Sequence, residues 1–238
     1  MQNKTGGNTI ISLYLTTYNT LQTILWTYII YLSCASYLNN NNNGQQQQQT
    51  TFWKVVSPYV LLAVGLSWME SMHAMLGLVK GTPASSAIQS FGRSHALLIP
   101  YAFTLAQENY ISLLLLYIVW GLSEIIRYPW YTLTSLNMCP YYLTWLRYSA
   151  FIVLYPIGII SELSGYWAAW PQINTFTGYD IQLSSIIGET YNHHYDLTLF
   201  RFRYWVIFGI IILYPLAGPY LYMYMLKQRN KKLKLKVM

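Results

Sequence analysis

Charge is what this sequence has least of. Only 9% of its 238 residues are charged, whereas a soluble domain carries roughly 25%. Hydrophobic residues make up 54% of the chain, which also contains 24 tyrosines and 9 tryptophans. So little charge among so many apolar and interfacial aromatic residues indicates an integral membrane protein rather than a large soluble core.

Cysteine is also scarce, since the chain has only Cys34 and Cys139. Two thiols so far apart in the sequence provide neither a disulfide framework nor a metal-ligand cluster. A thiol phosphatase would need an arginine six positions after its cysteine, and Cys139 is followed at that distance by Trp145. These absences exclude thiol phosphatase chemistry.

Metal-ligand patterns are incomplete. Glu70 and His73 are three residues apart, which places them on one helix face. Di-iron bundles use this spacing, but they need a second such pair and further carboxylates. We therefore expect no metal and no cofactor, and we predict a buried hydrogen bond between Glu70 and His73.

The net charge of +7 comes largely from one end of the chain, because residues 227–238 hold 6 of the 14 basic residues. A basic tail after an apolar segment is typical of a cytoplasmic end. Without a folded basic surface, we expect no nucleic-acid binding.

Apolar segments recur along the chain and predict an all-α fold, a single membrane domain over residues 1–238 with six transmembrane helices. Their approximate ranges are 10–38, 52–79, 84–106, 110–136, 142–163 and 202–226. The Asn/Gln-rich residues 39–50 are too polar to bury apolar surface, so we predict a disordered loop. A longer polar loop is expected over residues 165–199.

The segment 84–106 is the least hydrophobic of the six, and it could instead lie on the membrane surface. A spanning helix is favoured, because successive loops then alternate between loops with basic residues on one side of the membrane and loops without them on the other. With six spans both termini lie on one side, and the positive-inside rule makes that side the cytoplasm. Lys54, Arg201 and Arg203 are exceptions to the pattern.

Two polar residues in the fifth segment stand out. Tyr155 and Glu162 are seven residues apart, and seven helical steps come to about 700°, close to two full turns. The phenol and the carboxyl therefore share a face, about 10.5 Å apart along the axis. A charged group at membrane depth is by default a functional-site hypothesis.

Other polar pairs lie in the third and fourth segments. Gln89 and Arg93 share a helix face, and so do Glu124 and Arg127. For Glu124 and Arg127 two interpretations stay open. One is an intrahelical ion pair, and the other is a cation that Glu124 holds and aims at an anion.

Around this pair the sequence resembles a known family. The run Arg147-Tyr148, Leu154-Tyr155-Pro156-Ile157-Gly158 and Glu162 is similar to the signature of the 3-hydroxyacyl-CoA dehydratases, phosphatase-like membrane proteins of very-long-chain fatty acid elongation. Further matching blocks are Tyr18-Asn19, Glu70-Ser-Met-His73-Ala-Met-Leu-Gly77-Leu-Val79, Gln89 with Arg93, and Trp120-Gly-Leu-Ser-Glu124-Ile-Ile-Arg127-Tyr128.

The resemblance implies six transmembrane helices in the endoplasmic reticulum membrane and a catalytic pair at Tyr155 and Glu162. The family's other important polar or small positions fall on Glu70, Gln89, Arg93, Arg127, Arg147 and Gly158. The final Lys234-Leu-Lys236-Val-Met238 resembles the di-lysine signal that returns membrane proteins to the endoplasmic reticulum.

The implied reaction converts (3R)-3-hydroxyacyl-CoA into trans-2-enoyl-CoA, the third step of the elongation cycle. We hypothesise that Glu162 takes the C2 proton and Tyr155 donates to the leaving hydroxyl, with the reverse assignment as the alternative. The arginines could meet CoA phosphates or the thioester oxygen, or form ion pairs. Gly158 could let the acyl chain approach the helix backbone.

The resemblance also implies partners, namely membrane lipid and the condensing enzyme, ketoacyl-CoA reductase and enoyl-CoA reductase of the cycle. A catalytically silent membrane scaffold or a transporter is the alternative function. No inverted repeat and no matched pair of broken helices supports a transporter.

Overall fold

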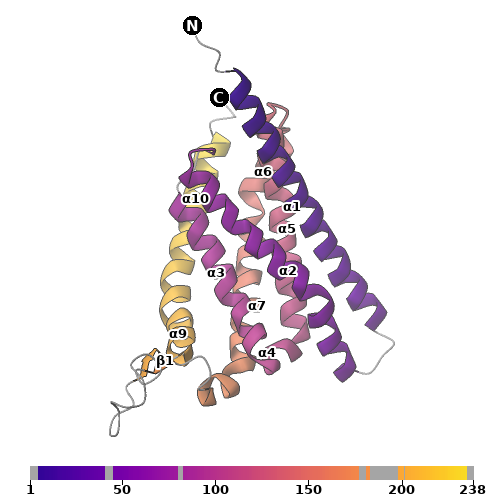
Figure 1. The fold of residues 1–238 in the computed structure, drawn as a ribbon, viewed down its shortest axis with the longest axis vertical. Helices are drawn as coiled ribbons and strands as arrows, with labels where there is room; N and C mark the ends of the chain where they lie inside the picture. Colours follow the sequence, from indigo (N-terminus) through magenta and orange to yellow (C-terminus); the bar gives the residue numbers. More distant parts are fainter. Residues whose placement is uncertain are drawn as a thin grey trace.

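The structure is a computed structural model, and it describes residues 5–40, 45–79, 83–176, 181–182, 198–200 and 202–234. In these residues the chain is helical apart from short connections and one short antiparallel pair of strands, β1 (Ile181–Gln182) and β2 (Thr198–Phe200) (Figure 1). The helices are α1 (Thr5–Asn40), α2 (Gln45–Met75), α3 (Pro83–Ala102), α4 (Thr104–Glu108), α5 (Tyr110–Ser135), α6 (Tyr141–Ser149), α7 (Phe151–Thr175), α9 (Phe202–Phe208), the π-helix η2 (Gly209–Ala217) and α10 (Gly218–Lys234).

Four stretches of the described residues are long and apolar enough to cross a membrane. They are Thr9–Leu38, Phe52–Met75, Tyr110–Ser135 and Tyr141–Thr175. The other two predicted spans, residues 84–106 and 202–226, are helical but are not among these four. The start of α1 and the end of α10 lie at the same end of the bundle (Figure 1).

The loop predicted over residues 165–199 is wrong for its first part, because α7 continues to Thr175. Tyr166, Ala169 and Ile173 are buried at helical spacing along this extension. Their burial against neighbouring helices stabilises helix where the polar composition had favoured a loop. The remainder of that loop lies outside the described residues, except for β1 and β2.

Helices also enter the Asn/Gln-rich tract from both sides, since α1 ends at Asn40 and α2 begins at Gln45. Glutamine has good helix propensity, so a membrane helix can extend through it. Residues 41–44 lie outside the described residues, and disorder of the tract stays a prediction.

The third segment is broken near its end. Phe103 has an extended backbone, with φ −128° and ψ 121°, between α3 and α4. Pro100 precedes the break, and proline weakens a helix because it lacks a backbone N–H.

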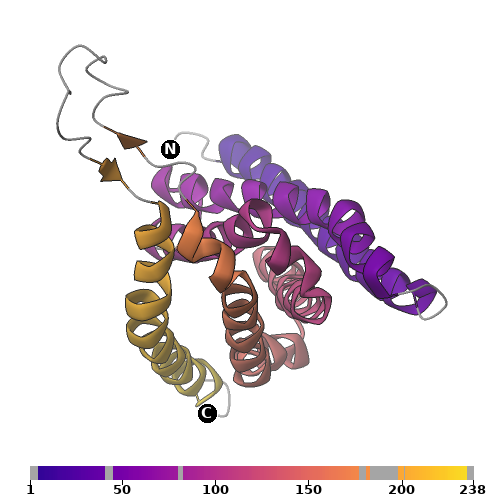
Figure 2. The ribbon, with the colours of Figure 1, turned by 90° about the horizontal axis from the view of Figure 1, so that it is seen from below.

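Helices α5 and α7 form the middle of the bundle. Helix α5 packs against α1 on one side and α7 on the other, and α7 also contacts α9 and η2. The last helical segment consists of α9, η2 and α10. Seen from below, α7 lies between α5 and this last helical segment (Figure 2). Trp26, Tyr117 and Tyr128 anchor one buried cluster, and Phe103 and Tyr166 anchor a second.

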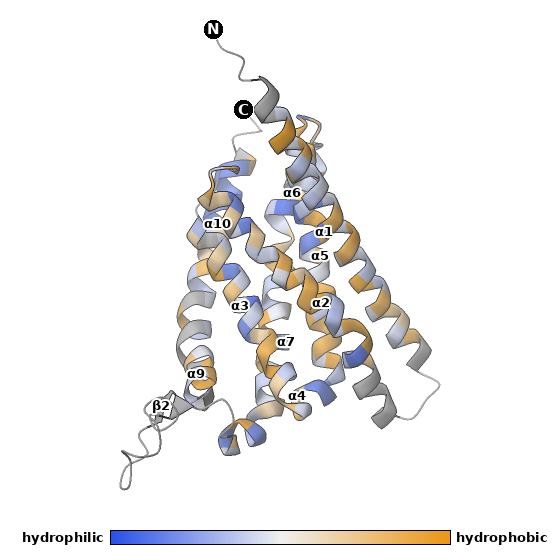
Figure 3. Cartoon of the chain, viewed as in Figure 1, coloured by the Kyte–Doolittle hydropathy of each residue, from blue (hydrophilic) through white to orange (hydrophobic). Residues whose placement is uncertain are grey.

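The last helical segment contains a π-helical stretch, η2, which includes Pro215. π-helical turns are rare and occur frequently at functional sites. Hydrophilic residues also occur within α3, α5 and α6, between more hydrophobic stretches (Figure 3). The π-helix and the hydrophilic residues indicate a candidate functional site in the interior, where α3, α5, α7 and η2 come together.

Candidate active site

The carboxylate of Glu162 is held by donors from two other helices. Tyr214 of η2 donates its hydroxyl to Oε2 of Glu162 at 2.5 Å. The indole Nε1 of Trp120, on α5, donates to Oε1 at 3.3 Å. Each carboxylate oxygen therefore has one donor, which fixes the orientation of the group and leaves lone pairs able to accept another proton.

Tyr155 lies two turns earlier on α7 and is also directed toward the last helical segment. Its hydroxyl donates to the backbone carbonyl of Gly218 at 3.1 Å. The ring of Tyr222 lies beside it, with ring centroids 5.9 Å apart. Both candidate catalytic groups thus contact residues 214–218, and the prediction that they share one face of α7 is confirmed.

Among the described residues, Tyr155 and Glu162 do not hydrogen-bond to each other. Their partners, Gly218 and Tyr214, are four residues apart in the last helical segment, whereas Tyr155 and Glu162 are seven residues apart on α7. A phenol donor and a carboxylate acceptor therefore flank a short length of the last helical segment.

A further pair lies behind Tyr214. The ring of Tyr166, one turn beyond Glu162 on α7, meets the ring of Tyr214 edge-on at 5.8 Å between centroids. The Tyr166 hydroxyl makes a short hydrogen bond with Nδ1 of His95 on α3. The His95 ring packs on the backbone of Gly209, where a Cβ would collide with Cε1 of the imidazole.

Arg93, Arg127, Glu70 and Glu124 form a buried ion network next to this site. Arg93 donates to Oε1 of Glu124 at 2.5 Å, and Arg127 donates to Oε2 of Glu124 at 2.7 Å. Arg127 also donates to both oxygens of Glu70, at 2.8 and 2.6 Å. The guanidinium of Arg93 lies 5.5 Å from the centre of the Trp120 ring.

The network answers the alternatives left open for the polar pairs. Glu124 and Arg127 form an intrahelical ion pair, which is one of the two open interpretations, and Arg127 also pairs with the carboxylate of Glu70. Gln89 accepts a hydrogen bond from Arg127 at 3.3 Å, and Arg93 donates to Glu124, so Gln89 and Arg93 both contact α5 and share one face of α3 as their spacing predicts.

The predicted hydrogen bond between Glu70 and His73 is wrong. Glu70 accepts hydrogen bonds from Arg127 and from the hydroxyl of Tyr128 at 2.6 Å. His73 pairs instead with the hydroxyl of Tyr14 at 2.8 Å. A bidentate guanidinium matches a carboxylate better than one imidazole nitrogen does, which explains the choice.

Arg147 lies in α6 and differs from the other two predicted arginines. Its Nε is buried and has no hydrogen-bond partner among the described residues. Gly158 is buried beside α5, where a Cβ would lie 3.6 Å from Cγ1 of Val119. This packing against α5 argues against an acyl chain meeting the α7 backbone at Gly158.

Tyr214 is not among the site residues predicted from the sequence, and Trp120 is included there only as part of a block that resembles the dehydratase family. One feature of the sequence does point to Tyr214. The tripeptide Leu-Tyr-Pro occurs at residues 154–156, which include Tyr155, and again at 213–215, which include Tyr214. The repeat marks the two helices that contribute Tyr155 and Tyr214 to this site.

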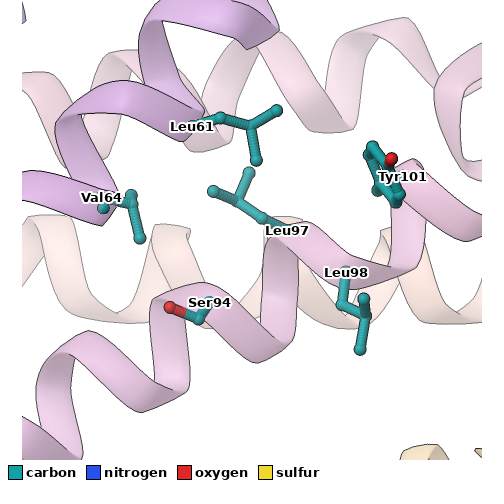
Figure 4. Close-up of a pocket in the computed structure, with 7 residues that line it drawn as sticks. Leu61, Val64, Ser94, Leu97, Leu98 and Tyr101 are labelled. Carbon is teal, nitrogen blue, oxygen red and sulfur yellow. The ribbon is translucent and has the colours of Figure 1, made fainter.

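An apolar pocket of about 270 Å³ lies elsewhere, between α2 and α3 (Figure 4). It is lined by Leu61, Val64, Gly65, Ser94, Leu97, Leu98 and Tyr101. It contains neither member of the Tyr155 and Glu162 pair. Within the described residues no group of three or more His, Cys, Asp or Glu side chains could hold a metal ion.

Comparisons with known proteins show which family the chain resembles. The chain is 30% identical over 233 residues to very-long-chain (3R)-3-hydroxyacyl-CoA dehydratase 2 of Mus musculus, covering 97% of this chain and 84% of the relative. It is 28% identical over 223 residues to very-long-chain (3R)-3-hydroxyacyl-CoA dehydratase PASTICCINO 2 of Arabidopsis thaliana, covering 92% of each. No solved structure matches the chain. Residues 64–235 match the model of the family described as protein tyrosine phosphatase-like protein, PTPLA, and the chain belongs to that family.

Proposed function

We propose that this protein is a hydro-lyase that removes water from (3R)-3-hydroxyacyl-CoA to give trans-2-enoyl-CoA in very-long-chain fatty acid elongation. The observation that carries the proposal is the arrangement of Tyr155 and Glu162, a phenol and a carboxylate on one face of α7 against the same five residues of the last helical segment. The relatives named as dehydratases support the same chemistry.

In the reaction Glu162 removes the C2 proton, which the neighbouring thioester acidifies. The C3–O bond breaks, and Tyr155 gives its proton to the departing hydroxyl, so that water leaves and the C2–C3 double bond forms. The two donors on Glu162 hold the carboxylate in place, which lowers the cost of orienting the base. Tyr155 exchanges its bond to the Gly218 carbonyl for one to the substrate oxygen.

Arg147 is the arginine available for the CoA end of the substrate. Arg93 and Arg127 are paired with buried carboxylates, and a guanidinium released from such a pair would leave an uncompensated charge. Within the part of the chain that the structure describes, Nε of Arg147 has no such partner. Arg147 also precedes Tyr155 along the chain, on the side of the cytoplasmic end in the proposed topology.

The proposed setting is the endoplasmic reticulum membrane, with six spans and both termini in the cytoplasm. The position of the α1 start and the α10 end at one end of the bundle supports an even number of spans (Figure 1). The proposed partners are the condensing enzyme and the two reductases of the cycle, which handle the preceding and following acyl-CoA intermediates.

A direct assay tests the activity. The protein is purified in mild detergent and incubated with a long-chain (3R)-3-hydroxyacyl-CoA. Mass spectrometry follows the loss of water from the substrate, a decrease of about 18 Da. We expect the enoyl product to accumulate, whereas the (3S) substrate should react poorly. A folded protein that binds partners or moves a solute but forms no enoyl-CoA would instead be a scaffold or transporter.

A further inference from the structure

Glu162 depends on a residue from the last helical segment for its position. Tyr214 donates to Oε2 of Glu162 at 2.5 Å, while the opposite oxygen receives the longer bond of 3.3 Å from Trp120. Bonds from a hydroxyl to a carboxylate are among the stronger hydrogen bonds in proteins, and they are short. The contact with Tyr214 is therefore the tighter of the two that orient the base.

The backbone around Tyr214 has an unusual conformation. Residues Gly209–Ala217 form a π-helix, with Tyr214 directly before Pro215. An extra residue per turn changes which side chains face the bundle interior, and such turns frequently lie at functional sites. This local geometry delivers the Tyr214 hydroxyl to Glu162.

The ring of Tyr214 is also supported from behind. Tyr166 meets it edge-on, and the hydroxyl of Tyr166 is fixed by His95. His95 in turn packs on Gly209, the first residue of the π-helix, where any side chain would collide with the imidazole. A ring held by this set has few orientations available, so its hydroxyl is pre-organised for the carboxylate.

We propose that Tyr214 is a positioning residue of the active site, which holds the carboxylate of Glu162 in the orientation needed for proton abstraction. This role rests on the proposed dehydratase function. Tyr214 acts through Glu162 and not on the reacting carbons. The proposal makes the last helical segment part of the catalytic site, with Gly218 bonded to Tyr155 and Tyr214 bonded to Glu162.

The test is the variant Tyr214→Phe, which keeps the ring and removes only the hydroxyl. Because the orientation of the base matters in the transition state, kcat is expected to fall about 10- to 100-fold while KM stays within about 2-fold. Rates are compared per folded protein recovered by size-exclusion chromatography. The matched control is Tyr224→Phe in α10. Tyr224 is exposed, its hydroxyl accepts a hydrogen bond from Gln228, and the variant should keep the wild-type kcat.

A second substitution avoids any question of folding. Fluorinated tyrosine at position 214 keeps the ring and the hydroxyl but changes the acidity of the hydroxyl, so kcat should change with the degree of fluorination at constant KM. A kcat for Tyr214→Phe within about 2-fold of wild type, or a kcat indifferent to fluorination, would overturn the role of Tyr214. Either result in an active wild-type enzyme leaves the dehydratase function intact, whereas an inactive wild type contradicts that function itself.

Discussion

Arg127 on α5 and Glu70 on α2 form a bidentate pair, with Nη1 2.8 Å from Oε2 and Nη2 2.6 Å from Oε1. The same guanidinium pairs with Oε2 of Glu124. The other oxygen of Glu124, Oε1, accepts a hydrogen bond from Arg93 on α3. Two positive and two negative groups thus cancel inside the bundle. The network joins α2, α3 and α5 and supports Trp120, which contacts both Arg93 and Glu162.

Replacing Arg127 with leucine should destabilise the protein strongly. The change leaves Glu70 and Glu124 without their shared cation, and breaking a buried pair from one side costs about 3–5 kcal/mol. Denaturant titration in detergent, followed by circular dichroism, should show a lower free energy of unfolding. The control is Lys231→Leu, at an exposed position near the end of α10. Equal unfolding midpoints for the two variants would show that the network contributes no stability.

Substitutions at the proposed catalytic pair should remove activity without removing the fold. Tyr155→Phe deletes the proton donor and Glu162→Gln deletes the base, and each is expected to lower kcat by about 10²- to 10⁴-fold. Turnover of (3R)-3-hydroxyacyl-CoA, measured by mass spectrometry, checks both.

Tyr222→Phe is the appropriate control for this experiment. Tyr222 packs beside Tyr155, with ring centroids 5.9 Å apart, and its phenylalanine variant retains that packing. We expect it to keep most of the wild-type turnover. If Tyr155→Phe or Glu162→Gln turned over substrate at nearly the wild-type rate, the catalytic assignment would be wrong.

Periodicity predicted the parts of this site that lie on a single helix. The seven-residue spacing of Tyr155 and Glu162 predicts that they share one face of their helix, and the four-residue spacing of Gln89 and Arg93 predicts the same for that pair. These results follow from helix geometry alone, because one segment contains both members of each pair.

Contacts between helices could not be obtained in the same way. Glu70 and Arg127 are 57 residues apart, and Glu162 and Tyr214 are 52 apart. Which helix faces which depends on packing, and local spacing does not encode it. For the same reason local spacing pairs Glu70 with nearby His73, although Arg127 is its actual partner. The pattern of hydrophobic residues also gives no sign of the π-helix that contains Tyr214.

Arg147 should matter for the CoA part of the substrate rather than for the acyl chain. Loss of one phosphate contact in Arg147→Gln is expected to raise KM for hydroxyacyl-CoA by about 10-fold, since charge-assisted hydrogen bonds contribute roughly 1.5–3 kcal/mol. The matched substrate is the corresponding acyl-pantetheine thioester, which lacks the nucleotide and its phosphates. On that substrate wild type and variant should have the same KM. An equal rise in KM on both substrates would contradict a phosphate contact.

The six-span topology makes a prediction about the two sides of the membrane. An Asn-X-Ser/Thr acceptor site introduced within residues 183–197 should be glycosylated in microsomes, because the proposed topology puts these residues on the lumenal side. The same site appended after Met238 should stay unmodified, because the proposed topology puts the basic end in the cytoplasm. Endoglycosidase-sensitive mobility on a gel distinguishes modified from unmodified protein.

Two outcomes would contradict the proposed topology. Modification of both sites would require an odd number of spans, and modification of only the C-terminal site would require the opposite orientation. In the opposite orientation Arg147, in α6 just before the helix that carries Tyr155 and Glu162, would be on the lumenal side and could not meet CoA arriving from the cytoplasm.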